Sequence, residues 1–166
     1  MKKNKRIRYI AYAGVIAAVY VVMTYVTNAF GLANGAIQCR FSEALCVLPA
    51  FTPAAVPGLF IGCLLSNFLT GAPAPDIIFG SLATLIGAIG TYFLARKKIN
   101  PLTFPLPAII ANTVIIPLVL KFAYTDIDGA LWFFAVTVGI GEIISCGILG
   151  MLLYYSLQKS AKLLFK

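Results

Sequence analysis

Long apolar runs alternate with short polar or turn-rich stretches along the chain. The first run extends from about Tyr9 to Thr27, and the turn-rich stretch NAFGLANG (28–35) follows it. A helix needs about 20 mostly apolar residues to cross a bilayer, so these runs predict membrane spans. We predict an all-α integral membrane protein, a bundle of six transmembrane helices in a single domain (1–166), with spans at about 9–27, 37–50, 54–69, 76–95, 102–122 and 130–157.

The predicted span at 37–50 differs from the others because it is short and carries two charges, Arg40 and Glu43. A charge near hydrocarbon costs at least a few kcal/mol unless it is paired or solvated. At a spacing of three, the two side chains share one face of an α-helix. We therefore predict that they form an ion pair at the outer mouth of the bundle. A short, polar segment at membrane depth also indicates a cavity beside it.

The composition places the chain in a bilayer and excludes several classes of function. Hydrophobic residues make up 61% and charged residues 11% of the 166 positions, and the mean hydropathy is +0.96. A soluble domain is roughly a quarter charged. The spans leave no room for a soluble catalytic or nucleotide-binding domain. No GxxxxGK[ST] motif occurs in the sequence, so an ATP-driven step would have to come from a partner.

The net charge of +8 comes mainly from three basic clusters, at residues 2–8, 96–98 and 159–166. Each cluster stands at the end of an apolar run, which argues against a nucleic-acid partner. Basic residues gather on the cytoplasmic side of membrane proteins. We therefore expect both termini in the cytoplasm and a multi-pass protein in the prokaryotic cell membrane.

Several polar residues interrupt the apolar spans and are candidates for a binding site. Glu142 is the most informative, because it falls about 18 Å along the sixth span, well inside hydrocarbon. An ionisable group at that depth indicates a functional site, although a Glu that only bridges helices is the alternative. Asp76 could instead be only a helix N-cap. On the predicted topology four polar residues lie in the outer half and two lie deeper: Arg40, Glu43, Asn67 and Asp76, then Asn112 and Glu142.

Enzymatic and metal-binding functions are not expected. The chain has no histidine, which excludes Ser/His catalysis and the HExxH zinc motif. Glu43 and Glu142 lack the sequence context of an intramembrane aspartyl-type dyad. The four cysteines form no CxxC pair and lie in apolar stretches, so we expect small buried residues, no metal and no cofactor: Cys39, Cys46, Cys63 and Cys146.

The first span carries two pairs of small residues at a spacing of four, Ala13 with Ala17 and Gly14 with Ala18. Such pairs let another helix approach closely in lipid. The partner helix could belong to the same chain or to another membrane protein. We predict a docking surface for a membrane partner, facing away from the binding site.

Four stretches together resemble one known family: IQCRFSEAL (37–45), FTPAAVPGLFIGCLLSN (51–67), DIIFGSLATL (76–85) and GIGEIISC (139–146). They are similar to the QueT family, substrate-binding (S) components of energy-coupling factor (ECF) transporters. The resemblance implies a six-helix protein that captures a queuosine precursor from outside. It also implies docking on a transmembrane coupling subunit with two ATPase subunits, which alone would hydrolyse ATP. S components similarly use small residues of the first helix for this docking.

The implied ligand is a deazaguanine base, such as queuine or its aminomethyl precursor. Its ring N–H and exocyclic amine are two parallel donors that one carboxylate can accept, and we assign this role to Glu142. A protonated amine on the ligand would require a second carboxylate. The ligand's carbonyl could accept from Asn67, Asn112 or Arg40, and an aromatic ring could stack on the base. The aromatic candidates are Phe41, Phe79 and Trp132.

Two other functions remain open from the residues alone. An S component for another vitamin or small polar metabolite would also place a few polar groups in an apolar bundle. A self-sufficient secondary transporter driven by an ion gradient is the second alternative. The chain shows no duplicated half of the kind common in such transporters, which argues against it.

Overall fold

The computed structural model describes residues 2–31, 40–123 and 130–161, and all regular secondary structure in these ranges is helical. This confirms the predicted all-α class. The elements in chain order are α1 (Lys2–Ala29), η1 (Phe41–Ala50), α2 (Ala55–Leu69), α3 (Ala74–Arg96), η2 (Pro101–Thr103), α4 (Leu106–Ala123), α5 (Leu131–Glu142), η3 (Ile143–Leu149) and α6 (Gly150–Gln158).

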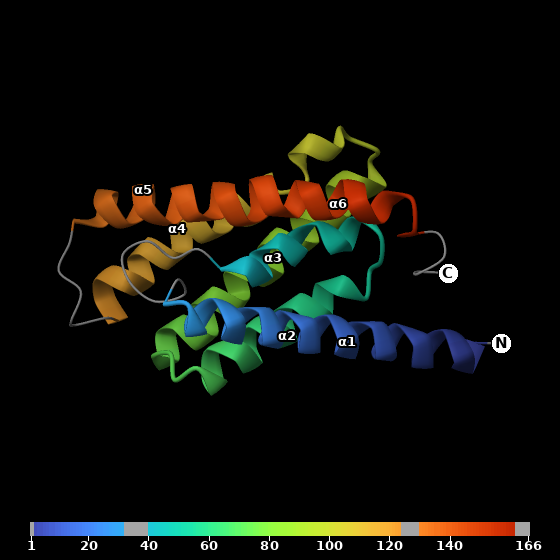
Figure 1. Cartoon of the computed structure of the whole chain (residues 1–166), viewed down its shortest axis with the longest axis horizontal. Helices are drawn as coiled ribbons and strands as arrows, with labels where there is room; N and C mark the ends of the chain where they lie inside the picture. The colour runs from blue at the N-terminus through green and yellow to red at the C-terminus, as the bar shows by residue number, and fades with distance from the viewer. Residues whose placement is uncertain (1, 32–39, 124–129, 162–166) are drawn as a thin grey trace.

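Four helical stretches are long and apolar enough to cross a membrane: residues 4–29, 74–96, 101–122 and 131–158. The last of these combines α5, η3 and α6, which form one continuous rod in Figure 1. Two shorter apolar helices, η1 and α2, accompany them. The predicted span at 37–50 corresponds to η1, but this is a 3₁₀ helix that begins only at Phe41. Residues 37–39 lie outside the described part.

The helices pack in the order in which the chain forms them. α1 contacts α2, α2 contacts α3, α3 contacts α4, and α4 contacts α5. The short helix η1 lies in the middle, where it touches α1, α3, η3 and α6 (Figure 1). The segment with the unusual charges is therefore enclosed by the rest of the bundle.

α1 and α2 approach closely because glycines of α2 face small residues of α1. A Cβ atom added at Gly62 would lie 2.7 Å from Cβ of Tyr20 and 3.1 Å from Cα of Ala17. A Cβ at Gly58 would lie 2.9 Å from the carbonyl oxygen of Ala13. Small residues on both helices permit this backbone contact, so both positions require glycine.

This packing corrects half of the predicted docking surface. Ala13 and Ala17 face α2 of the same chain, and Ala17 is only 6% exposed. Gly14 and Ala18, on the neighbouring stripe of α1, are exposed, and a Cβ at Gly14 would meet nothing within 4 Å. The two small-residue pairs therefore point in different directions.

The helix ends that carry basic residues gather at one end of the bundle. The Tyr9 hydroxyl, near the start of α1, donates to the Pro53 carbonyl. Arg96, at the end of α3, lines a cavity of about 180 Å³ together with residues 49–53. The Phe51 ring from the same turn stacks on Tyr154 of α6, with centroids 5.0 Å apart. In Figure 1 the first turns of α1 and the last turns of α6 likewise lie at the same end.

Candidate functional site

The site is built around η1, whose side chains are buried from Ser42 to Pro49. A 3₁₀ helix of ten residues is unusual, because runs longer than about 3–4 residues are uncommon. Arg40 precedes it with extended backbone angles, φ −102° and ψ 112°. Arg40 and Glu43 therefore do not share an α-helical face, and the geometric basis of their predicted pairing is missing.

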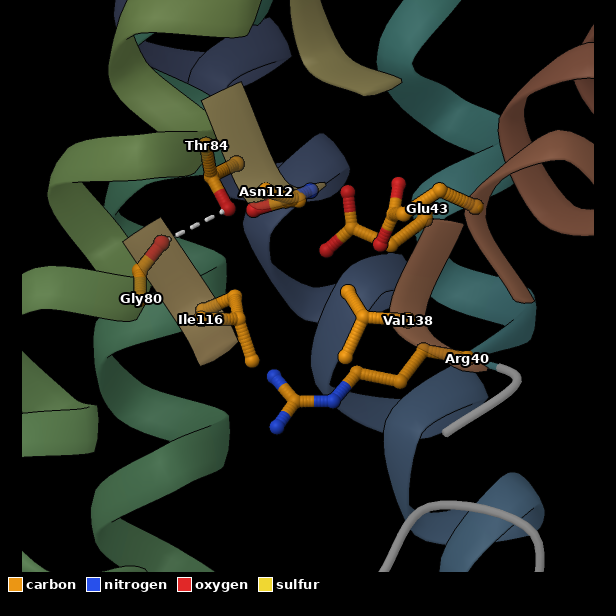
Figure 2. Close-up of a pocket in the computed structure, with 8 residues that line it drawn as sticks. Arg40, Glu43, Gly80, Thr84, Asn112, Ile116 and Val138 are labelled. Atoms are coloured by element: carbon orange, nitrogen blue, oxygen red, sulfur yellow. Dashed lines mark hydrogen bonds between the residues drawn. The ribbon is translucent and has the colours of Figure 1, made fainter. Parts of the chain in front are cut away.

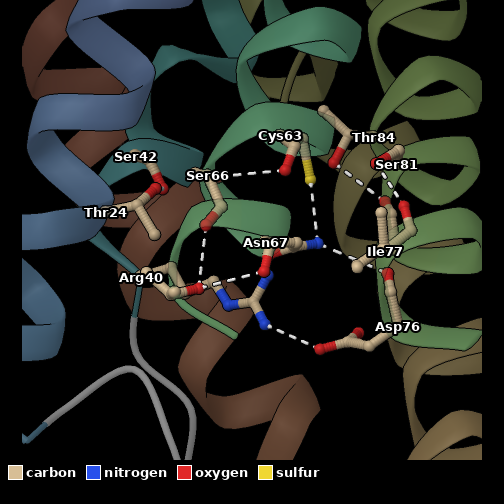
Figure 3. A network of polar contacts seen from close by, with 12 residues as sticks. Thr24, Arg40, Ser42, Cys63, Ser66, Asn67, Asp76, Ile77, Ser81 and Thr84 are labelled. Atoms are coloured by element: carbon tan, nitrogen blue, oxygen red, sulfur yellow. Dashed lines mark hydrogen bonds and ion pairs between the residues drawn. The ribbon is translucent and has the colours of Figure 1, made fainter. Parts of the chain in front are cut away.

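Arg40 pairs with a different carboxylate. Its Nη2 atom lies 3.4 Å from Oδ2 of Asp76 on α3, and its Nη1 atom donates to Oδ1 of Asn67 on α2 at 3.2 Å (Figure 3). The Arg40 side chain is 12% exposed and that of Asp76 is 2% exposed. The ion pair predicted between Arg40 and Glu43 is thus replaced by one that joins the start of η1 to α3.

Asn67 organises this network. Its Nδ2 atom donates to the Asp76 carbonyl at 3.3 Å and lies 3.6 Å from the Cys63 sulfur, while Oδ1 accepts from Arg40 (Figure 3). Gly80 leaves room for the network, because a Cβ there would lie 3.2 Å from both Asn67 Nδ2 and Asp76 Oδ1. Asn67 and Asp76, which were predicted to contact a ligand, therefore also position the Arg40 side chain.

Glu43 has a partner that the sequence did not indicate. The hydroxyl of Tyr20, which is fully buried on α1, donates to Oε1 of Glu43. One turn further along α1, the Thr24 hydroxyl donates to Ser42 at 2.9 Å. A tyrosine in the middle of an apolar helix needs a partner for its hydroxyl. This requirement is the one feature of the sequence that could have predicted a polar contact of Tyr20.

Glu142 ends α5, where the helix widens into the π-helix η3. The Cys146 thiol, one turn later, donates to Oε2 of Glu142 at 3.1 Å and lies 3.4 Å from the Glu43 carbonyl oxygen. One ligand atom from each of Glu43, Glu142 and Cys146 falls within 4.8 Å of the others. π-helical turns are rare and frequently occur at functional sites. The structure thus brings together the two carboxylates that stood out in the sequence.

Glu43 and Glu142 line one small pocket, which Figure 2 shows from close by. Its volume of about 10 Å³ holds about one water molecule. Asn112 of α4 is 3% exposed, and its side-chain amide interacts with the carboxylates of both Glu43 and Glu142. The pocket thus offers two carboxylates, a guanidinium and an amide. It is lined by Arg40, Glu43, Gly80, Thr84, Asn112, Ile116, Val138 and Glu142.

Two of the three aromatic residues that were candidates for stacking on a ligand do not lie at the pocket. Phe41 begins η1, is half-buried, and donates its backbone N–H to the Thr27 hydroxyl at 3.2 Å. Phe79 is 50% exposed and lines an apolar groove between α3 and α4, with a volume of about 580 Å³. Trp132 is 71% exposed. Phe79 and Trp132 therefore lie outside the polar pocket, because both project from the outer surface of the bundle.

Three of the four cysteines are free and buried, as expected: Cys46, Cys63 and Cys146. Cys39 lies outside the described residues. The sequence interpretation treated Cys146 only as a small apolar residue and missed its contact with Glu142.

Comparison with known proteins supports one family over almost the whole chain. The family model described as QueT transporter matches residues 10–159. The chain belongs to the QueT transporter family. The resemblance drawn from its four motifs is thus confirmed, and the four long apolar helices fit a transporter family.

This QueT family member is also similar to a curated protein, "Queuosine precursor transporter QueT" of Lactococcus lactis subsp. cremoris (strain MG1363). The two are 36% identical over 99 residues, which are 59% of this chain and 57% of the relative. The match therefore spans little more than half of the relative's length. No solved structure gives a significant match to the chain.

Proposed function

We propose that this protein is the S component of an ECF transporter and that it captures a queuosine precursor from outside the cell. The observation that carries the proposal is membership of the QueT transporter family across residues 10–159. The name of the Lactococcus relative supplies the substrate class. The buried polar pocket in an otherwise apolar bundle supports it, because small-ligand sites are apolar cavities with a few placed polar groups.

We further propose that the chain is one domain with six membrane segments, α1, η1, α2, α3, α4 and the α5–α6 rod. The gathering of the basic helix ends at one end of the bundle supports a cytoplasmic location for that end. Both termini would then lie in the cytoplasm of a prokaryotic cell. The pocket would open toward the opposite, outer side, where Arg40 stands at the beginning of η1.

In this proposal Arg40 closes the pocket over the ligand. A volume of about 10 Å³ excludes a deazaguanine base, so binding requires side chains to move apart. Arg40 lines the pocket and is held by side chains of α2 and α3 (Figure 3). Displacing its guanidinium would open a path to Glu43, Asn112 and Glu142, and Phe41 at the same end of η1 could stack on the base.

In this proposal the protein itself does not hydrolyse ATP. A transmembrane coupling subunit and two ATPase subunits would drive uptake, and the exposed stripe of Gly14 and Ala18 is the surface we assign to the coupling subunit. Small residues let two helices approach closely, and the resulting packing favours helix association in lipid.

Native mass spectrometry of the protein as purified from its cell membrane tests the proposal directly. We expect an adduct with the mass of a deazaguanine base, and coupling and ATPase subunits in a mild-detergent preparation. An adduct with another vitamin would keep the S-component role and change the substrate. Uptake by the protein alone in liposomes, driven by an ion gradient, would replace the proposal with a secondary transporter.

A further inference from the structure

A second cavity lies at the end of the bundle where the basic helix ends gather (Figure 1). Its volume of about 180 Å³ gives room for several water molecules, whereas the polar pocket holds about one. Its walls are the turn at residues 49–53, between η1 and α2, and the last turns of α3. No residue lines both cavities. The second cavity is therefore separate from the proposed substrate site.

Arg96, the last residue of α3, brings a positive charge to this cavity. Its guanidinium carbon lies 5.1 Å from the centroid of the Tyr92 ring, one turn earlier on the same helix. A guanidinium that stacks on a ring still presents the N–H groups at its edge to an acceptor. In the described ranges the acidic residues are Glu43, Asp76 and Glu142, and all three lie around Arg40. The charge of Arg96 is thus available to an anion from outside the chain.

Thr52 contributes a hydroxyl from the other wall of the cavity. The residue is 7% exposed, and its Oγ1 atom accepts from the Ala54 backbone N–H at 3.4 Å. A hydroxyl that accepts a hydrogen bond can still donate its own proton. The cavity therefore combines a forked cationic donor with a neutral donor, and the oxygens of a phosphate group accept from both kinds.

The cavity lies at the depth of the lipid headgroups. α3 has 23 residues and is therefore about 35 Å long, slightly more than the hydrocarbon core of about 30 Å. Arg96 ends this helix and so reaches the boundary of the core. Two tyrosines contact the turn at residues 49–53, Tyr9 through the Pro53 carbonyl and Tyr154 through the Phe51 ring. Tyrosine is enriched at the membrane interface, which agrees with this depth.

We propose that this cavity binds the phosphate of an anionic phospholipid from the cytoplasmic leaflet, with Arg96 as its ion-pair partner and Thr52 as a second donor. The leaflet follows from the orientation proposed above, whereas the lipid contact is independent of the substrate. Basic pockets between membrane helices on the cytoplasmic side suit acidic headgroups. The acyl chains lie along the outer face of α3, where Ile89 is 38% and Phe93 58% exposed.

The surroundings favour a lipid over a soluble anion. Phe93 precedes Arg96 by three residues, so the two side chains share a face of α3. Leu102, which follows the basic linker, is 61% exposed. A molecule with both a phosphate and apolar chains matches this combination. The general preference for basic residues on the cytoplasmic side accounts for the charge of residues 96–98. It does not account for the cavity, because Lys97 and Lys98 carry the same charge and do not line it.

Native mass spectrometry of the purified wild-type protein tests the proposal. The protein is titrated in detergent with phosphatidylglycerol or with phosphatidylcholine of the same acyl chains, which is zwitterionic. We expect the first bound lipid to be phosphatidylglycerol, with an affinity at least about tenfold higher than that for phosphatidylcholine. Equal affinities for the two lipids would overturn the proposal. This comparison requires no variant, so it decides the question even where a variant does not fold.

Three variants then locate the headgroup. Arg96→Gln should reduce phosphatidylglycerol affinity at least about thirtyfold, because a charged hydrogen-bond partner is lost. Lys97→Gln is the matched control, since it removes the same charge from the next residue, and it should reduce affinity only about fivefold. Thr52→Val changes no charge and should still reduce affinity about fivefold. Thermal unfolding in detergent without added lipid verifies that each variant is folded.

Three further outcomes would overturn the proposal. Equal losses in Arg96→Gln and Lys97→Gln would leave only a diffuse attraction to basic residues. Displacement of the lipid by inorganic phosphate at low millimolar concentration would make the cavity a site for a soluble anion. An Arg96→Gln variant that keeps wild-type lipid affinity but no longer copurifies with the coupling subunit would assign the cavity to a protein partner. Binding of the deazaguanine base should be unchanged in all three variants, so the proposed function stands or fails separately.

Discussion

A carboxylate oxygen of Glu43, on the 3₁₀ helix η1, lies within 4.8 Å of one on Glu142, at the junction of α5 and the π-helix η3. Glu43 lies in the 3₁₀ helix, Glu142 ends α5 directly before the π-helix, and both residues are buried. Two carboxylates this close repel each other when both are ionised. The protein therefore holds in its interior either two repelling charges or one proton shared by the two carboxylates, and a binding role would account for keeping such a pair.

Replacing one of these carboxylates should stabilise the empty protein. Glu142→Gln keeps the shape of the side chain and an acceptor for the Cys146 thiol but removes the repulsion with Glu43. We expect the free energy of unfolding to rise by about 1 kcal/mol. The same variant should bind the proposed base more than about a hundredfold more weakly. Thermal unfolding in detergent, with and without base, measures both effects.

Asp76→Asn is the matched control, because it makes the same chemical change in a carboxylate that has a cationic partner. It should lower stability, since it leaves the Arg40 guanidinium buried with less compensation. If the two substitutions change stability in the same direction, the repulsion between Glu43 and Glu142 is not the cause.

The charged candidates were predictable because charge is rare in this chain. Glu142 could be identified from its depth in an apolar run, and the structure places it beside Glu43 as part of one pocket. Tyr20 was missed because an aromatic residue in an apolar helix does not interrupt the pattern. Its role depends on a tertiary contact with Glu43.

The wrong predictions are those that depended on the direction in which a side chain points. The spacing of Arg40 and Glu43 predicts an ion pair only if both lie in an α-helix, and Arg40 is extended. The two small-residue pairs of α1 look alike in sequence. Only the position of Gly58 and Gly62 on α2 determines that Ala13 and Ala17 face inward.

A double-mutant cycle tests the ion pair between Arg40 and Asp76. Removing one partner of a buried pair costs about 3–5 kcal/mol, whereas replacing both costs much less. Arg40→Leu combined with Asp76→Leu should therefore be less destabilising than the sum of the two single changes. The unfolding free energy in detergent is the measurement. The corresponding cycle of Arg40 with Glu43 should be closer to additive, and a larger coupling there would contradict the assigned partner.

The close contact between α1 and α2 can be tested by enlarging a glycine at the contact and, as a control, a glycine of α1 that faces away from it. Gly62→Ala places a Cβ 2.7 Å from Cβ of Tyr20. It should destabilise the protein by about 1–3 kcal/mol and weaken base binding by displacing Tyr20 from Glu43. Gly14→Ala meets nothing within 4 Å and should change stability by no more than about 0.5 kcal/mol. Equal effects of the two substitutions would show that the helices do not pack at Gly62.

The exposed stripe of α1 provides the last prediction, which separates binding from assembly. Gly14→Leu combined with Ala18→Leu enlarges side chains that face outward, while Ala13 and Ala17 keep their contact with α2. Because helices in lipid associate through close backbone approach, the larger side chains should hold the proposed coupling subunit away. We expect the double variant to fold, to bind the base with wild-type affinity, and to lose both copurification with the coupling subunit and uptake. Ala17→Leu is the contrasting change, because it presses directly on Gly62 and should reduce folding yield and base affinity. If the Gly14 and Ala18 double variant still assembles and transports normally, the coupling subunit docks elsewhere on the bundle.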